Sequence, residues 1–308
     1  MINRRHLRVK VMQILYALNI AGSGDIDAGY IQLRENIDKM YELYLIHLGI
    51  LAAIRRKAES IYIKSEKLYF KNRLKTLVSP NVKNNRLLRN IDQALDDHPG
   101  IAEYWDEHSE MLERLWNELI RKKLYKKYSG IDRPTFEDDK GFVKDMFRDI
   151  IAPHEVLYEF YTGASLGWAD DYPSVNTRIM QHLAAMKPNI SFAPDRLFKF
   201  PSDWDYALLL LKKSFERSGE LAVIIDEHTP NWDYDRIMPI DRTLLIMALT
   251  EFLDFPSIPT RVTINEYIEI SKDYATEKSA FFINGVLDKL LKKFTAENLI
   301  HKSGKGLR

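Results

Sequence analysis

The chain has 308 residues, a formal net charge of +1 and no cysteine, with 45% hydrophobic and 29% charged residues. This composition is typical of a soluble globular protein, and the lack of cysteine excludes a disulfide framework and a thiolate metal site. It also suits a reducing compartment, so we expect a cytoplasmic location. No apolar run reaches the length of a membrane span, and we expect no membrane partner.

The first predicted element is an amphipathic helix over residues 4–20, a segment with basic side chains and no acidic one. On one side of this helix, Arg5 and Arg8 are followed by Tyr16. Arginine pairs with phosphate in fork geometry and stacks on bases, and a tyrosine ring offers a stacking platform, so this side suits RNA. A solvated basic helix end is the alternative interpretation. The apolar face consists of Leu7, Val11, Ile14, Leu15 and Leu18.

A long helix is predicted from about residue 31 to residue 70, and its second half begins a segregation of charge. Residues 55–90 are rich in lysine and arginine, whereas residues 92–118 are rich in aspartate and glutamate. Two interpretations fit this pattern: the basic segment extends an RNA-binding surface, or the acidic helices neutralise it within the fold. The basic side chains concerned are Arg55, Arg56, Lys57, Lys64, Lys67, Lys71, Arg73 and Lys75.

Helical periodicity continues over residues 101–128, 137–161 and 175–186, and it resumes near residue 205 after a proline-punctuated connector. Alternation typical of strands is nearly absent, so the predicted fold class is all-α. The chain also contains a weak internal repeat with an offset of 64 residues, and we expect residues 139–186 to be a structural copy of residues 203–249. The matching residues are Asp139, Trp168, Asp171 and Arg178 against Asp203, Trp232, Asp235 and Arg242.

Two helices in series are predicted over residues 255–294. Thr263 and Glu266 have the spacing of a capping box in the first, and Thr276 is the expected N-cap of the second. The second helix carries Asn284-Gly285 in its middle, where glycine costs about 1 kcal/mol relative to alanine. A glycine in a helix interior indicates that a backbone or a ligand approaches closely, and helix packing against Gly285 is the simpler explanation.

Three blocks of this sequence together resemble one family. The blocks read RRHLRVKVMQILYAL, NWDYDRIMPIDRTLLIMALTEFL from residue 231, and IPTRVTINEYIEISKDYATEKSAFFINGVLDKL. Their order and the final run S-x-x-F-I-N-G-V-L-D are similar to the transcription antitermination factor NusB family. The resemblance implies a NusB-like helical bundle of two subdomains, formed by residues 1–24 and 196–295. Residues 25–195 are then a large helical insertion, and residues 296–308 a basic flexible tail.

The resemblance also implies a function without catalysis or cofactor. It implies binding to single-stranded boxA-type RNA in ribosomal RNA leaders together with the ribosomal protein NusE, within the RNA polymerase antitermination complex, to promote processive transcription. We expect the first and last helices to lie side by side and share one RNA surface. The sequence leaves open whether Phe281 or Phe282 carries the exposed ring. Carried over to matching positions, the RNA-binding residues are Arg4, Arg5, Arg8, Tyr16, Lys278, Ser279 and Phe282, and the residue facing NusE is Asp241.

Two other classes of function were weighed. A non-catalytic helical scaffold or ribosome-assembly interaction protein would use the insertion as a docking arm. A metal-dependent nuclease would need a carboxylate cluster, although short acid pairs at helix starts are more often partners of the helix dipole. The sequence contains no phosphate-binding glycine loop and no dinucleotide motif, so no enzyme is predicted. The acids that a nuclease would use are Asp203, Asp205, Asp233 and Asp235.

Overall fold

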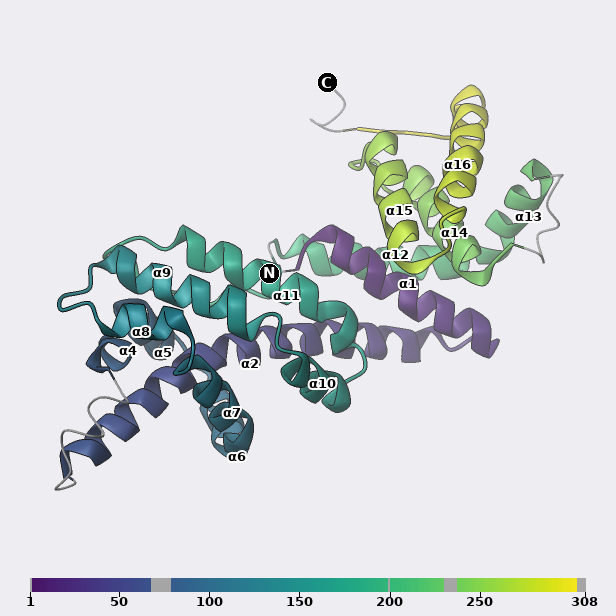
Figure 1. The fold of residues 1–308 in the computed structure, drawn as a ribbon. Helices are drawn as coiled ribbons and strands as arrows, with labels where there is room; N and C mark the ends of the chain where they lie inside the picture. The colour runs from purple at the N-terminus through teal and green to yellow at the C-terminus, as the bar shows by residue number, and fades with distance from the viewer. Residues whose placement is uncertain (1, 68–78, 199, 230–236, 304–308) are drawn as a thin grey trace. The chain divides into compact units, whose positions relative to one another are not determined.

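The computed structural model describes residues 2–67, 79–198, 200–229 and 237–303 (Figure 1). Within these ranges every regular element is a helix, and the only β-type pairing is an isolated bridge between Ile2 and Phe198. The predicted all-α fold class is therefore confirmed. None of the helices in the described ranges is both long and apolar enough to cross a membrane.

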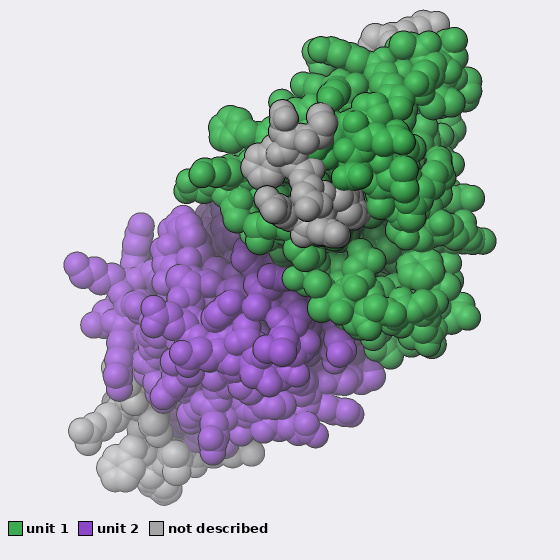
Figure 2. All heavy atoms as spheres, turned by 90° about the vertical axis from the view of Figure 1, so that its right-hand side faces the viewer, with its two compact units in different colours: residues 1–37, 197–308 green, residues 38–196 purple. Residues whose placement is uncertain are grey.

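The chain divides into two compact units (Figure 2). Unit 1 consists of residues 1–37 and 197–308, and unit 2 consists of residues 38–196. The boundary falls inside one continuous helix, α2 (Ile26–Lys67), which is the long helix predicted from residue 31. Unit 1 thus joins the two ends of the chain around a segment that folds as a unit of its own.

Unit 1 is built around helix α14 (Pro239–Asp254), in which all residues from 243 to 252 are buried. The sequence TLLIMALTEF is apolar on nearly every side, which is the pattern of a helix surrounded by others. Helices from both ends of the chain pack around it. They are α1 (Arg4–Ala21), α12 (Ser202–Glu216), α13 (Ser218–His228), α15 (Thr260–Tyr274) and α16 (Ser279–Ala296).

Helix α1 is fixed at its start and along its apolar face. The Asn3 side chain caps it by accepting a hydrogen bond from the His6 N–H, and the Ile2 N–H donates to the Leu197 carbonyl at 3.0 Å. Leu7 and Val11 are fully buried. Helix α1 packs against α12, α14 and α15, whereas α16 packs against α13, α14 and α15. Both α1 and α16 pack on α14 and α15, and the side-by-side arrangement of the first and last helices stays a prediction.

The chain stays on unit 1 after α16 ends. The Lys302 ammonium group donates to the Glu251 and Phe255 carbonyls at 2.8 and 2.9 Å, and so satisfies carbonyl groups at the end of α14. The Ser303 N–H donates to the Pro256 carbonyl. Residues 302 and 303 are therefore held at the end of α14, which differs at this point from the flexible tail predicted from residue 296.

Unit 2 packs short helices around the remaining part of α2. Arg55 and Arg56 of α2 both bind the carboxylate of Asp92, and Lys57 binds Glu113. For these three side chains the structure supports neutralisation within the fold, while Lys71, Arg73 and Lys75 lie outside the described residues. The helices are α4 (Pro80–Asn84), α5 (Arg86–Ala94), α6 (Pro99–Glu107), α7 (Ser109–Leu119), α8 (Lys123–Ser129), α9 (Phe136–Met146), the π-helix η1 (Phe147–Ile151), α10 (Glu155–Ala164) and α11 (Trp168–Ala185).

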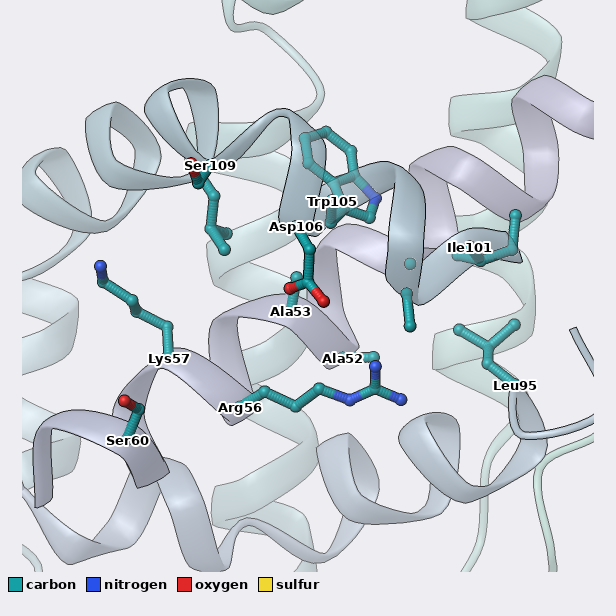
Figure 3. A pocket seen from close by; sticks show the side chains of 13 residues that line it. Ala52, Ala53, Arg56, Lys57, Ser60, Leu95, Ile101, Trp105, Asp106 and Ser109 are labelled. Carbon is teal, nitrogen blue, oxygen red and sulfur yellow. The ribbon is translucent and has the colours of Figure 1, made fainter. Parts of the chain in front are cut away.

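A pocket of about 300 Å³ lies between α2 and the α6–α7 pair of unit 2 (Figure 3). Its α2 side combines small residues with the side chains of Arg56 and Lys57, and a Cβ atom at Gly49 would come within 2.4 Å of Ile101 Cγ2. Glycine is thus required here for the close approach of α6 to α2. The Trp105 indole N–H fixes the same contact by donating to the Ile46 carbonyl at 2.9 Å.

The two segments of the predicted repeat have similar helix lengths and share all but one of the buried positions in these helices, the exception being Ile151. With an offset of 64 residues, the α9–η1 segment falls on α12, and α10 falls on α13. Trp232 and Asp235 of the second segment lie outside the described residues. That the two segments are structural copies stays a prediction, which this correspondence supports. The buried residues are Asp139, Phe142, Val143, Met146, Phe147, Ile150, Leu157 and Tyr161 in one segment, and Asp203, Tyr206, Ala207, Leu210, Leu211, Ser214, Leu221 and Ile225 in the other.

Candidate nucleic-acid interface

The arginine-rich start of α1 contains one residue that is fully inside the protein. The side chain of Arg8 is 3% exposed and forms a bidentate pair with Glu251 of α14, with Nε–Oε1 and Nη2–Oε2 distances of 2.7 and 3.1 Å. Burial acts to lower the pKa of Arg8, but the negative charge of Glu251 outweighs it and raises that pKa. Arg8 was predicted to bind RNA, whereas the structure uses its guanidinium group to hold α1 on α14.

The carboxylate of Glu251 is completely buried and has further partners. The Thr263 hydroxyl donates to it at 2.9 Å and the Tyr267 hydroxyl at 3.2 Å, and the Tyr206 hydroxyl also donates to it. Burial raises the pKa of both Tyr206 and Tyr267 well above the ordinary value, so both stay protonated as donors. This network joins α1, α12, α14 and α15 through one charge.

The other two arginines are half-exposed but also meet carboxylates. Arg5 forms a bidentate pair with Glu266 of α15, with two N–O distances of 2.9 Å, and its side chain is 44% exposed. The hydrogen bond from Arg5 lowers the pKa of Glu266. Arg4 approaches Asp203 of α12 at 3.4 Å. The basic end of α1 is therefore largely neutralised, and of the three arginines only Arg4 and Arg5 present nitrogen atoms to the surface.

The capping box predicted at the start of α15 is not formed. The helix begins at Thr260, one turn earlier than expected, and the Thr263 hydroxyl donates to Glu251 instead of capping. Glu266 binds Arg5 and Arg8. The sequence shows the carboxylates Glu251 and Glu266, but it does not show that their helices, α14 and α15, lie beside α1.

The junction of α14 and α16 is closed by a buried hydrogen bond. The Ser279 hydroxyl donates to Oδ2 of Asp241 at 3.0 Å, and both side chains are buried. Burial raises the pKa of Asp241. Its Oδ1 atom is also buried, without a hydrogen-bond partner among the described residues. Both predicted site residues therefore contribute to the packing of α16. Helix α16 starts at Ser279 with Lys278 as its N-cap, so the predicted cap Thr276 is wrong.

Two rings at the start of α16 differ in their exposure. Phe281 is 83% exposed, whereas Phe282 is only partly exposed. Lys278, immediately before the helix, is also exposed. A Cβ atom at Gly285 would meet no atom within 4 Å, so the predicted helix packing against this glycine is wrong. Tyr16, on α1, is 37% exposed.

No group of three or more metal-ligating side chains is found within the described residues. Asp203, one of the four acids of the nuclease alternative, instead accepts hydrogen bonds from Arg4 and from the Phe200 N–H. Asp233 and Asp235 lie outside the described residues. The fold and this site together define an all-helical protein in which ion pairs fasten the first helix to a bundle formed by the last five.

The chain belongs to the NusB family. Residues 195–292 match the NusB family. This match covers α12 to α16, apart from the end of α16. The chain is 41% identical over 107 residues to the transcription antitermination protein NusB of Salinibacter ruber, covering 35% of this chain and 67% of that protein. The family is not one of enzymes.

Two further relatives carry the same name. The protein of Chloroherpeton thalassium is 35% identical over 103 residues, covering 33% of this chain and 49% of that protein. The protein of Methylacidiphilum infernorum is 42% identical over 82 residues, covering 27% and 57%. The chain thus spans about half to two thirds of the length of these relatives. No solved structure matches the chain.

Proposed function

We propose that this protein is a transcription antitermination factor that binds boxA-type single-stranded RNA in ribosomal RNA leaders. In this proposal it acts together with the ribosomal protein NusE in the antitermination complex of RNA polymerase, in the cytoplasm, and promotes processive transcription. Unit 1 contains the NusB-like core that we propose for residues 1–24 and 196–295. The observation that carries the proposal is the family match over α12 to α16.

The accessible chemistry of unit 1 supports RNA as the ligand. Arg5 keeps a half-exposed guanidinium group, and Tyr16 and Phe282 keep partly exposed rings. Lys278 adds a positive charge at the N-terminal end of α16, where the helix dipole also favours an anion. Phosphate contacts and base stacking are the two interactions by which single-stranded RNA is held.

The remaining predicted residues take supporting roles in this proposal. Arg8 holds α1 in place, and Ser279 with Asp241 holds the start of α16 on α14. We keep Asp241 as the proposed NusE-facing position, because it lies at the first turn of α14 beside that junction. Substituting Asp241 should weaken the binding of NusE and also loosen the packing of α16 on α14.

The proposal is tested by measuring the binding of a boxA RNA by fluorescence anisotropy, with and without NusE, over a range of salt concentrations. Arg5→Ala should weaken binding and reduce the salt slope by about 0.7, the value for one lost phosphate contact on a single strand. Phe282→Ala should weaken binding without changing the slope. Arg148→Ala is the matched control, because Arg148 is an exposed, ion-paired arginine of unit 2.

The result that contradicts the proposal is a wild-type protein that binds boxA RNA no more tightly than a scrambled RNA, in both the presence and the absence of NusE. If NusE binds and RNA does not, the protein is instead a protein-interaction scaffold.

A further inference from the structure

We propose that Phe281 and Gly285 form a shelf on α16, beside Phe282, on which one unpaired base of the bound RNA stacks. The family resemblance assigns a role to neither of these two residues. This inference rests on the proposed RNA binding and names an additional contact within it.

The shelf follows from the helical positions of the residues. Gly285 is four residues after Phe281 and three after Phe282, so it lies on the same side of α16, one turn further along and between the directions of the two rings. Lys278 occupies the corresponding place one turn earlier. The buried residues Ile283, Leu287 and Leu290 face the opposite side, toward α14 and α15.

Among the residues of unit 1 that the structure describes, none lies beside α16 at Gly285. A side chain at this position would point into open space, since a Cβ atom would have no neighbour within 4 Å. The backbone does not require glycine either, because Gly22 is the only glycine with positive φ among the described residues. Glycine is a poor helix former, and neither packing nor backbone conformation requires it here, which is also true of Gly141 and Gly163. What distinguishes Gly285 is the exposed ring of Phe281 four residues earlier. A ligand that lies against the bare backbone would explain it.

The exposed ring identifies the chemistry of that ligand. Phe281 is 83% exposed, and an aromatic ring beside a flat stretch of backbone matches the face of a nucleobase. Bases within a duplex stack on each other, so the base must come from a single strand. Asp288 is exposed one turn beyond Gly285 and would repel a phosphate, while Lys278 would attract one. The base therefore lies over Phe281 and Gly285, with its phosphate toward Lys278.

The experiment uses the full-length protein and a boxA RNA in which each nucleotide is replaced in turn by an abasic one. Phe281→Ala should weaken binding of the intact RNA roughly 5- to 100-fold, the range for one lost stacking contact, with no change in the salt slope. One abasic position should weaken binding to the wild-type protein but cause no further loss in Phe281→Ala.

Gly285→Leu provides an independent test, because leucine is a good helix former and fills the shelf. It should weaken RNA binding as much as Phe281→Ala while keeping the thermal stability of the wild type. Gly285→Ala is the matched control and should bind RNA much more tightly than Gly285→Leu.

The outcomes separate the shelf from the proposed function. If Phe282→Ala weakens binding while Phe281→Ala and Gly285→Leu do not, the shelf is wrong and the RNA-binding function stands. If these two variants lose NusE recruitment but keep RNA affinity, the surface binds protein and the shelf is again overturned. If the wild-type protein shows no preference for boxA RNA, the proposed function itself fails.

Discussion

Helix α12 of unit 1 and the α9–η1 segment of unit 2 use the same contact to hold a second helix. Each has a buried aspartate in its first turns, Asp203 or Asp139, that pairs with the first arginine of another helix. In unit 1 that arginine is Arg4 of α1, and in unit 2 it is Arg86 of α5. Both arginines directly follow an asparagine N-cap, Asn3 or Asn85.

The two copies differ in what the attached helix does afterwards. Helix α1 continues for 18 residues and presents Arg5 and Tyr16 at the surface. Helix α5 has only 9 residues, and its Asp92 neutralises two arginines of α2. The comparison shows that the same contact can hold either a helix with an exposed face or a helix that neutralises charges inside the fold, depending on the side chains beyond the first turn.

The largest effect is expected from breaking the fully buried ion pair between Arg8 and Glu251 in unit 1. Glu251→Ala leaves Arg8 buried with only its 3.5 Å contact to Glu266, which should lower the free energy of unfolding of unit 1 by about 3–5 kcal/mol. Denaturant unfolding followed by tryptophan fluorescence measures this. Replacing both Arg8 and Glu251 by methionine should recover most of the loss, and a double variant as unstable as the single one would contradict the buried-charge explanation.

The two aspartates test how far the copies are equivalent. Asp139 accepts hydrogen bonds from the Tyr128 hydroxyl at 2.6 Å and from the Arg86 N–H and Nε at 3.0 and 2.7 Å, whereas Asp203 meets Arg4 Nε at 3.4 Å and the Phe200 N–H at 3.0 Å. Asp139→Ala should therefore cost about 2–3 kcal/mol, and Asp203→Ala about 1 kcal/mol less, in chemical denaturation. A larger loss for Asp203→Ala would mean that the two contacts are not comparable.

Titration with acid should affect each unit through histidines whose pKa burial lowers in the folded state, and in unit 2 the pKa of His182 is shifted in the same direction as that of His47. Burial lowers the pKa of His6 in unit 1 and of His47 in unit 2 from 6.5 to about 4. Both are neutral in the folded state, so their contribution to stability is complete above pH 6.5 and is lost as the pH falls toward 4. His47→Gln should reduce the pH dependence of unit 2 unfolding between pH 6.5 and 4, and His6→Gln that of unit 1. An unchanged pH profile in both variants would assign the acid sensitivity to carboxylates.

The smallest effects come from a pair of glycines with opposite surroundings. Gly49→Ala should destabilise unit 2 by about 1–3 kcal/mol, because the new methyl group would overlap Ile101. Gly285→Ala should stabilise unit 1 by about 0.5–1 kcal/mol, because alanine is the better helix former and the space is free. Thermal unfolding of the two variants compares them directly, and a destabilised Gly285→Ala would show that α16 is covered at that point.

The sequence predicted the fold class and most helices because apolar periodicity is a local property. Residues 4–20 and 31–70 correspond closely to α1 and α2 for this reason. The burial of Arg8 was not predictable, because its partner Glu251 lies 243 residues later in the chain. The apolar pattern of the helix that contains Glu251 does not indicate which charge it meets. The prediction for Gly285 was wrong for a related reason. A glycine in a helix interior indicates an unusual position, but only the structure shows that no described atom lies within 4 Å of a Cβ atom placed there.

The ion pairs of α1 also set the order in which unit 1 is completed during synthesis. The ribosome makes Arg8 long before Glu251, and at about 5–20 residues per second the interval is roughly 12 to 50 s. Until residue 203 is made α1 has none of its counter-charges, and until residue 251 it lacks the partner of Arg8 and the complete helices α14 and α15, while the residues of unit 2 are already available. A chain that stops before residue 250 should therefore contain a protease-resistant unit 2 and a degraded N-terminus. The nascent helix is thus a basic, apolar segment that other molecules can reach before unit 1 closes over it.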